Sequence, residues 1–241
     1  MVTNPTPQDE PRSGLIPASS PEAVSVTRYA RKNLRSLIAI LRMVRSLILR
    51  KDSYLYSTGF HLSLAEKRPC DARGADIPWM NYSFVSLLNE RLSKDLDIFE
   101  YGSGASTRFF STRCASVTSC EHDREWYDKV LRTLPDNAHL MLKPADKDGH
   151  YCRAIRDAGA HYDVVLIDGL DRNNCLTHAV DCLSDRGVII LDDSHRERYR
   201  PLFSVLADAG FRCLTIEGLK PLQKRVHSTT VFYRDGNCMK I

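Results

Sequence analysis

The chain has 241 residues and a formal net charge of +4, and it is 43% hydrophobic and 27% charged. This composition is too apolar for a disordered protein, and the chain is too long for a minimal disulfide-stapled module. No run of about 18 uncharged apolar residues is present, so the sequence predicts no membrane-spanning helix. We expect one domain of α/β size with an N-terminal extension.

The eight cysteines are scattered along the chain, with no C-x-x-C pair and no cysteine–histidine cluster at zinc spacing. The N-terminus shows no short apolar core preceded by positive charge, as a secretory signal would. Both features favour a reduced, cytoplasmic protein whose thiols are mostly buried.

Residues 1–25 contain five of the eleven prolines, among Ser, Thr and Gly. Such a segment buries too little apolar surface to offset the entropy lost on ordering. We therefore predict a disordered, proline-rich tail over residues 1–25.

Residues 26–51 carry eight basic residues and no acidic one, so the positive charge of the chain is local. Leu34, Leu37, Leu41 and Ile48 share one face at helical spacing. Three interpretations stay open: the helix packs on its own domain, packs on a second subunit in a homodimer, or lies on an anionic membrane surface. We do not expect a nucleic-acid partner, because the rest of the chain is slightly acidic and shows no recognised binding motif.

We place the basic helix and further helices in residues 26–95, with a helix over SFVSLLNERL, and the α/β domain in residues 96–241. Short apolar runs alternate there with helix-like stretches, which is typical of a parallel sheet with crossover helices. The predicted strands are 96–100, 116–121, 139–143, 162–168, 187–193, 211–217 and 228–234. The short gap before the last strand predicts an antiparallel end. The expected fold is doubly wound α/β, with a mostly parallel seven-stranded sheet and an antiparallel last strand.

The strongest motif is E-Y-G-S-G-A-S, from Glu100 to Ser106, between a predicted strand and a predicted helix. Glycines let the backbone turn sharply and approach a ligand without a Cβ in the way. Glu121 ends the next predicted strand, where a carboxylate can accept hydrogen bonds from the ribose hydroxyls of an adenosine-type cofactor. Together they predict a cofactor site.

These residues resemble the first motif and the ribose-binding acid of the class I S-adenosylmethionine-dependent methyltransferases, over about residues 96–234. The resemblance implies S-adenosyl-L-methionine as cofactor, with Asp146 near the adenine. The third small position is Ser106, where the family has glycine. The alternative cofactor is a nicotinamide dinucleotide, whose fingerprint wants a third glycine where Thr107 stands. The expected cofactor-binding residues are Glu100, Gly102, Ser103, Gly104, Ser106, Glu121, His122, Asp146, Asp168 and Gly169.

A second group of acids follows the fourth and fifth predicted strands: Asp168, then Asp192 and Asp193 with His195 close behind. Ligands of doubly wound sheets lie beyond the carboxyl ends of the strands. Three roles stay open: structural caps of the loops, catalytic residues that orient or deprotonate the acceptor (Asp168, Asp193 and His195), or ligands of a divalent cation (Asp168, Asp192 and Asp193).

Arg172 and Arg196 follow these acids by a few residues and could bind an acidic group of a substrate, although acids of the chain itself could claim them. Trp79 could cover the substrate pocket or belong to the core, and Lys220 and Pro221 could line its mouth. We therefore expect a methyltransferase acting on a small-molecule or glycan-type acceptor, with oxygen as the methylated atom. The alternative is a non-catalytic membrane-surface or interaction module that keeps the fold.

Overall fold

The computed structural model describes residues 21–241, except for the side chains of residues 21–32 and 49. Most of the predicted tail, residues 1–20, lies outside this part of the chain. The structure divides into two compact units, with the division between Arg50 and Lys51. Residues 51–95, which the sequence grouped with the basic helix, therefore belong to the same unit as the sheet.

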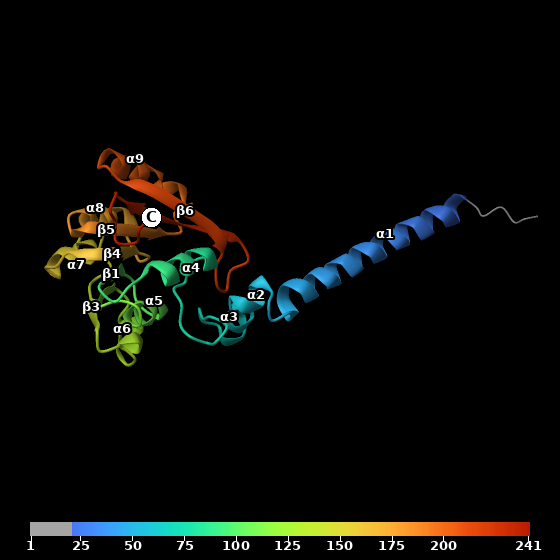
Figure 1. Cartoon of the computed structure of the whole chain (residues 1–241), viewed down its shortest axis with the longest axis horizontal. Helices are drawn as coiled ribbons and strands as arrows, with labels where there is room; N and C mark the ends of the chain where they lie inside the picture. The colour runs from blue at the N-terminus through green and yellow to red at the C-terminus, as the bar shows by residue number, and fades with distance from the viewer. Residues whose placement is uncertain (1–20) are drawn as a thin grey trace, which may run out of the picture. The chain divides into compact units, whose positions relative to one another are not determined.

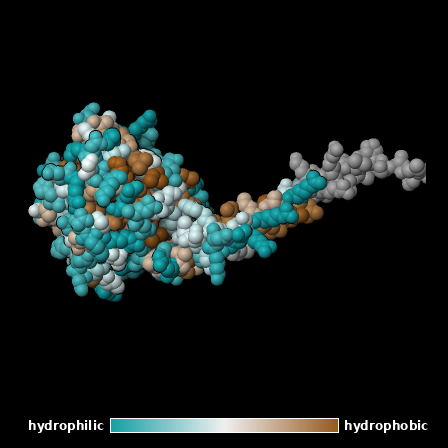
Figure 2. Space-filling view, in the orientation of Figure 1, coloured by the Kyte–Doolittle hydropathy of each residue, from teal (hydrophilic) through white to brown (hydrophobic). Residues whose placement is uncertain are grey.

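The first unit is the helix α1 (Pro21–Val44), followed by a π-helical turn (Arg45–Leu49). Residues 21–25, predicted as tail, are thus helical, and a proline is tolerated in a first helical turn because its missing N–H has no partner there. The apolar residues Leu34, Leu37 and Leu41 are exposed. Apolar and hydrophilic side chains lie beside one another along α1 in Figure 2. Within the described residues, no helix has the length and apolar character needed to cross a membrane.

The second unit contains a seven-stranded sheet in the order β3-β2-β1-β4-β5-β7-β6 (Figure 1). The strands are β1 (Asp97–Tyr101), β2 (Ser116–Glu121), β3 (Ala138–Leu142), β4 (Tyr162–Ile167), β5 (Leu183–Asp192), β6 (Arg212–Leu219) and β7 (Val226–Tyr233). The pairs from β3 to β5 are parallel, and β7 pairs antiparallel with both β5 and β6. The predicted doubly wound sheet with an antiparallel last strand is confirmed.

Helices cover both faces of this sheet (Figure 1). On one face, α7, α8 and α9 pack in a core that includes Phe99, Tyr151 and Leu176. On the other, α4 and α5 pack in a core that includes Phe84, Ile98 and Phe110. The helices of the second unit are α2 (Tyr54–Ser57), α3 (Phe60–Glu66), α4 (Tyr82–Arg91), α5 (Ala105–Ser111), α6 (Arg124–Leu131), α7 (His150–Asp157), α8 (Arg172–Val180), a 3₁₀ turn (Glu197–Tyr199) and α9 (Arg200–Asp208).

The central strands are apolar because both of their faces are covered: all of β4 is buried, and so is the second half of β5. The chain leaves β1 toward β2 on one side and meets β4 on the other, so the sheet reverses its strand order between β1 and β4. Ligands of doubly wound sheets bind at the carboxyl ends of the strands beside such a reversal. The fold thus places the tips of β1, β2, β4 and β5 at one edge.

Strand β5 is longer than predicted and begins at Leu183 rather than at residue 187. Its polar first half is paired with the buried carboxylate of Asp163: the Ser184 hydroxyl donates to it at 2.7 Å and Arg186 Nε at 3.0 Å. All eight cysteines are free, and Cys213 alone among them is exposed. This confirms that the thiols are mostly buried.

Candidate functional site

The glycine loop between β1 and α5 has a backbone that favours glycine. Gly102 has φ +101° and Gly104 has φ +137°, in a region that residues with a Cβ rarely adopt. The Gly102 N–H donates to the Cys120 carbonyl of β2 at 2.8 Å. A Cβ on Gly102 would lie 3.6 Å from the Asp168 carbonyl oxygen at the tip of β4. The loop therefore lies at the strand-order reversal, as the motif predicted.

Glu100 lies beneath this loop and is almost fully buried. Its Oε1 accepts hydrogen bonds from the hydroxyls of Thr107 and of Ser119, the latter at 2.6 Å, while its Oε2 is buried and has no hydrogen-bond partner. Burial raises the pKa of Glu100, and the hydroxyls of Ser106, Ser119 and Thr107 act in the opposite direction. Since buried polar atoms are nearly always hydrogen-bonded, Oε2 is an unsatisfied group that a ligand or a water molecule could complete.

Glu121, at the end of β2, faces the same loop. Its Oε2 accepts from the Ser103 hydroxyl at 2.8 Å, and its Oε1 accepts from the backbone N–H groups of His122 at 2.8 Å and Asp123 at 3.0 Å. The His122 ring lies edge-on to Tyr151, with ring centroids 5.8 Å apart. The structure thus brings Ser103, Glu121 and His122 together beside the glycines.

Asp146 lies in the connection after β3 and holds the N-terminus of α7. Its two carboxylate oxygens accept from the backbone N–H groups of His150 at 2.7 Å and Tyr151 at 3.0 Å. These hydrogen bonds lower the pKa of Asp146. An adenine contact, as the family resemblance implies, would have to compete with this capping role.

Gly169, which follows Asp168, makes room for a tyrosine. A Cβ on Gly169 would lie 1.9 Å from the hydroxyl oxygen of Tyr151, so no other residue fits without displacing that ring. The carbonyl of Gly169 accepts from Arg172 Nε at 3.0 Å. Glycine is therefore required here for packing against Tyr151.

The acids at the tips of β4 and β5 are paired with cations. Arg172 donates to Asp168 Oδ1 at 2.8 Å and also to the Asp192 carbonyl. Burial and the nearby Asp192 raise the pKa of Asp168 to about 7, while Arg172 and Lys220 oppose this rise. Asp168 is therefore a carboxyl group that can gain or lose a proton near neutral pH.

Lys220 is the central cation of this cluster, and the sequence did not rank it among the site residues. Its Nζ lies 2.5 Å from Asp192 Oδ2 and 3.3 Å from Asp193 Oδ1, and all three side chains are buried. Burial alone would lower the pKa of Lys220, but Asp192 and Asp168 raise it overall. Thr229 donates to the other oxygen of Asp192 at 2.7 Å. The ammonium thus neutralises two carboxylates that would otherwise repel each other.

The predicted cation site at Asp168, Asp192 and Asp193 receives no support. The Lys220 ammonium already lies between the last two carboxylates. Among the residues that the structure describes, the groups with a suitable ligand arrangement are Asp148 with Cys152 and His178, and Asp193 with His195 and His227. Neither is the predicted set.

His195, one of the three predicted catalytic candidates, is exposed and lies edge-on to His227, with centroids 5.3 Å apart. Its Nδ1 accepts the backbone N–H of Ser228 at 3.4 Å. His227 Nδ1 lies 2.9 Å from Asp193 Oδ1. His195 is therefore close to the acidic cluster, and a catalytic role for it stays a prediction.

Two predicted substrate residues lie at the rim of the cluster. Trp79 donates from Nε1 to the Pro221 carbonyl at 2.6 Å, and Lys220 Nζ lies 5.7 Å from the centre of its half-exposed ring. Arg196 is exposed and pairs with Asp193. The third, Arg172, is mostly buried and held by the tips of β4 and β5. Trp79 and Arg196 thus lie beside the charged cluster, and their contacts with a substrate stay predictions.

The chain matches no protein-family model and no curated protein. Among solved structures it is similar to a precorrin 8w decarboxylase from Methanobacterium thermoautotrophicum, with 18% identity and a TM-score of 0.50 over 70% of this chain and 97% of that one. It is also similar to a spermidine synthase from Thermotoga maritima, with 13% identity and a TM-score of 0.49 over 64% and 58% of the two chains. A precorrin-6y C5,15-methyltransferase from Geobacter metallireducens has 17% identity and a TM-score of 0.47 over 71% and 96%.

At such low identity, these likenesses bear on the fold alone. The first of them spans nearly the whole of the solved chain, and the strand order and the antiparallel β7 agree with the sheet that the sequence resemblance implied. The chain has the seven-stranded, Rossmann-like fold of the class I S-adenosylmethionine-dependent methyltransferases.

Proposed function

We propose that the protein is an S-adenosylmethionine-dependent methyltransferase that methylates an oxygen of a small-molecule or glycan-type acceptor. One observation carries the proposal: Gly102 and Gly104 form a left-handed turn between the unsatisfied Oε2 of Glu100 and the carboxylate of Glu121. A bare backbone beside a carboxylate at this edge of the sheet suits the ribose and methionine parts of the cofactor. When bound, this cofactor supplies a methyl group on a sulfonium centre.

Glu121 is the group that would hold the ribose hydroxyls. The Ser103 hydroxyl that now donates to it can rotate away, so a ribose hydroxyl would replace one hydrogen bond to the carboxylate with another of the same kind. Ser103 and His122 contact the same carboxylate, while Ser106 interacts with Glu100. Glu100 Oε2 would accept a donor, or donate if protonated, from beneath the glycines.

Thr107 favours this cofactor over a nicotinamide dinucleotide. It stands where the dinucleotide fingerprint needs a glycine for close helix–strand packing. Its hydroxyl accepts from the Gly104 N–H at 2.9 Å and donates to Glu100. The buried side chain therefore ties the glycine loop to the acid of β1.

Asp168 is our candidate for the base. During methyl transfer the acceptor oxygen would take the methyl group as the bond between that group and the cofactor sulfur breaks, and the Asp168 carboxylate would accept the proton of the acceptor hydroxyl. A pKa of about 7 suits such a transfer at neutral pH. Lys220 and Asp193 would fix the position of the acceptor through the charged cluster at the tip of β5.

Titration calorimetry with S-adenosylmethionine, S-adenosylhomocysteine and NAD tests the cofactor assignment. We expect both sulfur compounds to bind and NAD not to bind. Binding of NAD alone would make the protein an oxidoreductase, and no binding at all would favour a non-catalytic module.

Transfer of a labelled methyl group tests the acceptor. We expect label in small molecules or glycans from a cell extract, and label in RNA instead would overturn the acceptor class. Arg196→Ala should raise the KM for the acceptor several-fold and leave the affinity for the cofactor unchanged, because Arg196 lies at the rim, away from the glycine loop. Loss of cofactor binding in this variant would contradict that placement.

For α1 we propose a role at an anionic membrane surface. The supporting observation is that its apolar residues Leu37 and Leu41 are exposed beside the basic residues Arg35 and Arg42. Each basic residue near such a surface contributes about 1 kcal/mol. The full chain should sediment with phosphatidylserine vesicles, and the double variant Arg35→Glu with Arg42→Glu should not. Equal sedimentation of the wild type and the double variant would favour packing on protein. A dimer that persists in the double variant in ultracentrifugation would favour the same alternative.

A further inference from the structure

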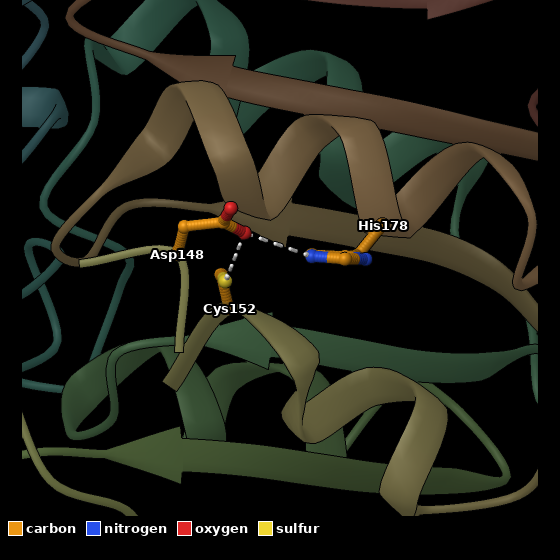
Figure 3. A group of neighbouring side chains, drawn as sticks. All are labelled: Asp148, Cys152 and His178. Carbon is orange, nitrogen blue, oxygen red and sulfur yellow. Dashed lines mark hydrogen bonds and ion pairs between the residues drawn. The ribbon is translucent and has the colours of Figure 1, made fainter. Parts of the chain in front are cut away.

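A second group of side chains lies outside the proposed cofactor and acceptor site, where the N-terminus of α7 meets α8 (Figure 3). Asp148 precedes α7, Cys152 lies in its first turn and His178 lies in the last turn of α8. Asp148 Oδ1 lies 3.6 Å from His178 Nε2 and 3.9 Å from Cys152 Sγ. All three potential ligand atoms lie within 4.8 Å of one another.

The imidazole of His178 lacks the partners of an ordinary structural histidine. Its side chain is 13% exposed, its Nδ1 is buried without a hydrogen-bond partner, and its Nε2 is too far from Asp148 for a hydrogen bond. A buried ring nitrogen is normally satisfied. The ring presents Nε2 to the Asp148 carboxylate, while Nδ1 lies on its other side (Figure 3), so a neutral imidazole protonated at Nδ1 has the lone pair of Nε2 available to a ligand.

The surroundings of the cluster are acidic. Burial, together with the carboxylates of Asp171, Asp148 and Asp146, raises the pKa of the Cys152 thiol to about 11, and the single cation Arg153 opposes this. Arg153 is half-exposed and lies 3.8 Å from Asp148. The Asp148 N–H also donates to Asp171 Oδ2 at 2.8 Å, which fixes the loop. Such a negative site favours a divalent cation.

We propose that Asp148, Cys152 and His178 bind one zinc ion. Thiolate, imidazole and carboxylate are the ligands that Zn²⁺ takes in proteins, and tetrahedral geometry with their usual bond lengths separates the ligand atoms by about 3.4–3.6 Å. The distances from Asp148 of 3.6 Å to His178 and 3.9 Å to Cys152 are close to these values, and the third pair lies within 4.8 Å, so side-chain rotations would close the remaining gap. The side chain of Asp148 is 59% exposed, so water can take the fourth position.

Bound zinc would join the connection after β3, which carries Asp146, to α8, which begins at Arg172. The ion would thereby tie together two segments that each carry a residue of the proposed cofactor and acceptor site. Binding would displace the thiol proton of Cys152, so the affinity should rise with pH.

The test is titration of the full chain with zinc against a chromophoric chelator, with cobalt as a spectroscopic substitute. We expect one tightly bound zinc per chain and a thiolate-to-cobalt charge-transfer band. Cys152→Ser should remove the band, and Cys152→Ser and His178→Gln should each weaken zinc binding by more than about a hundredfold, because even residues behind a ligand contribute 10–100-fold. Asp148→Asn should weaken zinc binding and keep the band.

The matched controls are Cys213→Ser, which removes the exposed thiol, and His139→Gln, which removes an exposed imidazole on β3. Both should bind zinc like the wild type. Circular dichroism shows whether each variant is folded. A wild-type chain without stoichiometric zinc, or a folded Cys152→Ser variant with unchanged affinity and cobalt spectrum, overturns the proposal, whatever the outcome of the cofactor experiments.

Discussion

Two groups of acids meet at the same edge of the sheet, and they differ in their partners. At the tips of β1 and β2, Glu100 and Glu121 accept hydrogen bonds from hydroxyls and backbone N–H groups. At the tips of β4 and β5, Asp168 and Asp192 face the guanidinium of Arg172 and the ammonium of Lys220. The first group accepts only from neutral donors and leaves Glu100 Oε2 without a partner, whereas the second group is paired with cations.

This difference separates an exchangeable site from a fixed one. The hydrogen bond from the Ser103 hydroxyl to the Glu121 carboxylate is worth about 1.5–3 kcal/mol, but a ligand hydroxyl that takes its place makes a hydrogen bond of the same kind, so the exchange costs little. Breaking a buried ion pair costs about 3–5 kcal/mol, so the partners of Lys220 stay in place when a ligand arrives. The β1 and β2 side is therefore built to bind, and the β4 and β5 side to hold charges in preset positions.

The largest effect should follow from Lys220→Met, which leaves Asp192 and Asp193 buried without their shared cation. We expect the free energy of unfolding in urea to fall by about 3–5 kcal/mol. Lys143→Met, which breaks the more exposed pair with Asp157, should cost less than about 1 kcal/mol. Equal losses in the two variants would show that the cluster is no more fixed than a surface pair.

Gly102→Val tests the exchangeable side. The branched side chain enters the space of the proposed cofactor from a backbone with φ +101°. We expect the affinity for S-adenosylmethionine in calorimetry to fall at least about a hundredfold, which is about 2.7 kcal/mol. Gly236→Val has similar backbone strain at φ +73° and open space around it, and it should bind normally.

Glu121→Ala should weaken S-adenosylmethionine binding by about 1.5–3 kcal/mol, because hydrogen bonds to a charged group are worth about that much. The variant also leaves the Ser103 hydroxyl without its acceptor. Glu125→Ala removes an exposed carboxylate nearby on α6 and should have no effect on calorimetric affinity. An unchanged affinity in Glu121→Ala would remove the ribose contact from the proposal.

The sheet could be predicted because hydrophobic runs mark strands whose two faces are covered. That signal fails where polar side chains find buried partners, as at the start of β5, where Ser184 and Arg186 bind Asp163 across 21 and 23 residues. It also fails at α1, whose first turn contains residues that a proline-rich composition assigned to the tail.

The glycine loop and Glu121 could be predicted because their spacing is local to one strand–helix–strand unit. Lys220 could not be ranked, because it reaches Asp192 only when β6 and β7 fold back beside β5. A signal existed for Asp146: an acid a few residues before a helix commonly accepts from that helix's first N–H groups. Asp148 and His178 are 30 residues apart and no short motif joins them.

The smallest effect concerns the proton on Asp168. Its pKa is raised from the ordinary 3.8 to about 7, so between pH 4 and 7 the folded state holds a proton that the unfolded state has lost. The free energy of unfolding therefore falls as the pH rises through this window. Water reaches the 28% exposed side chain, so we expect a loss on the order of 1 kcal/mol rather than the full effect of the shift.

Urea unfolding of the wild type and of Asp168→Asn between pH 4.5 and 8 measures the difference, with Asp185→Asn as the exposed control. Asp193 does not confuse the result, because Lys220, His227 and Arg196 outweigh the effect of burial and lower its pKa, which places its own stability change below pH 4. A difference between wild type and Asp168→Asn that stays constant with pH would mean that Asp168 is already ionised across the window, and would leave the acceptor without a base at the tip of β4.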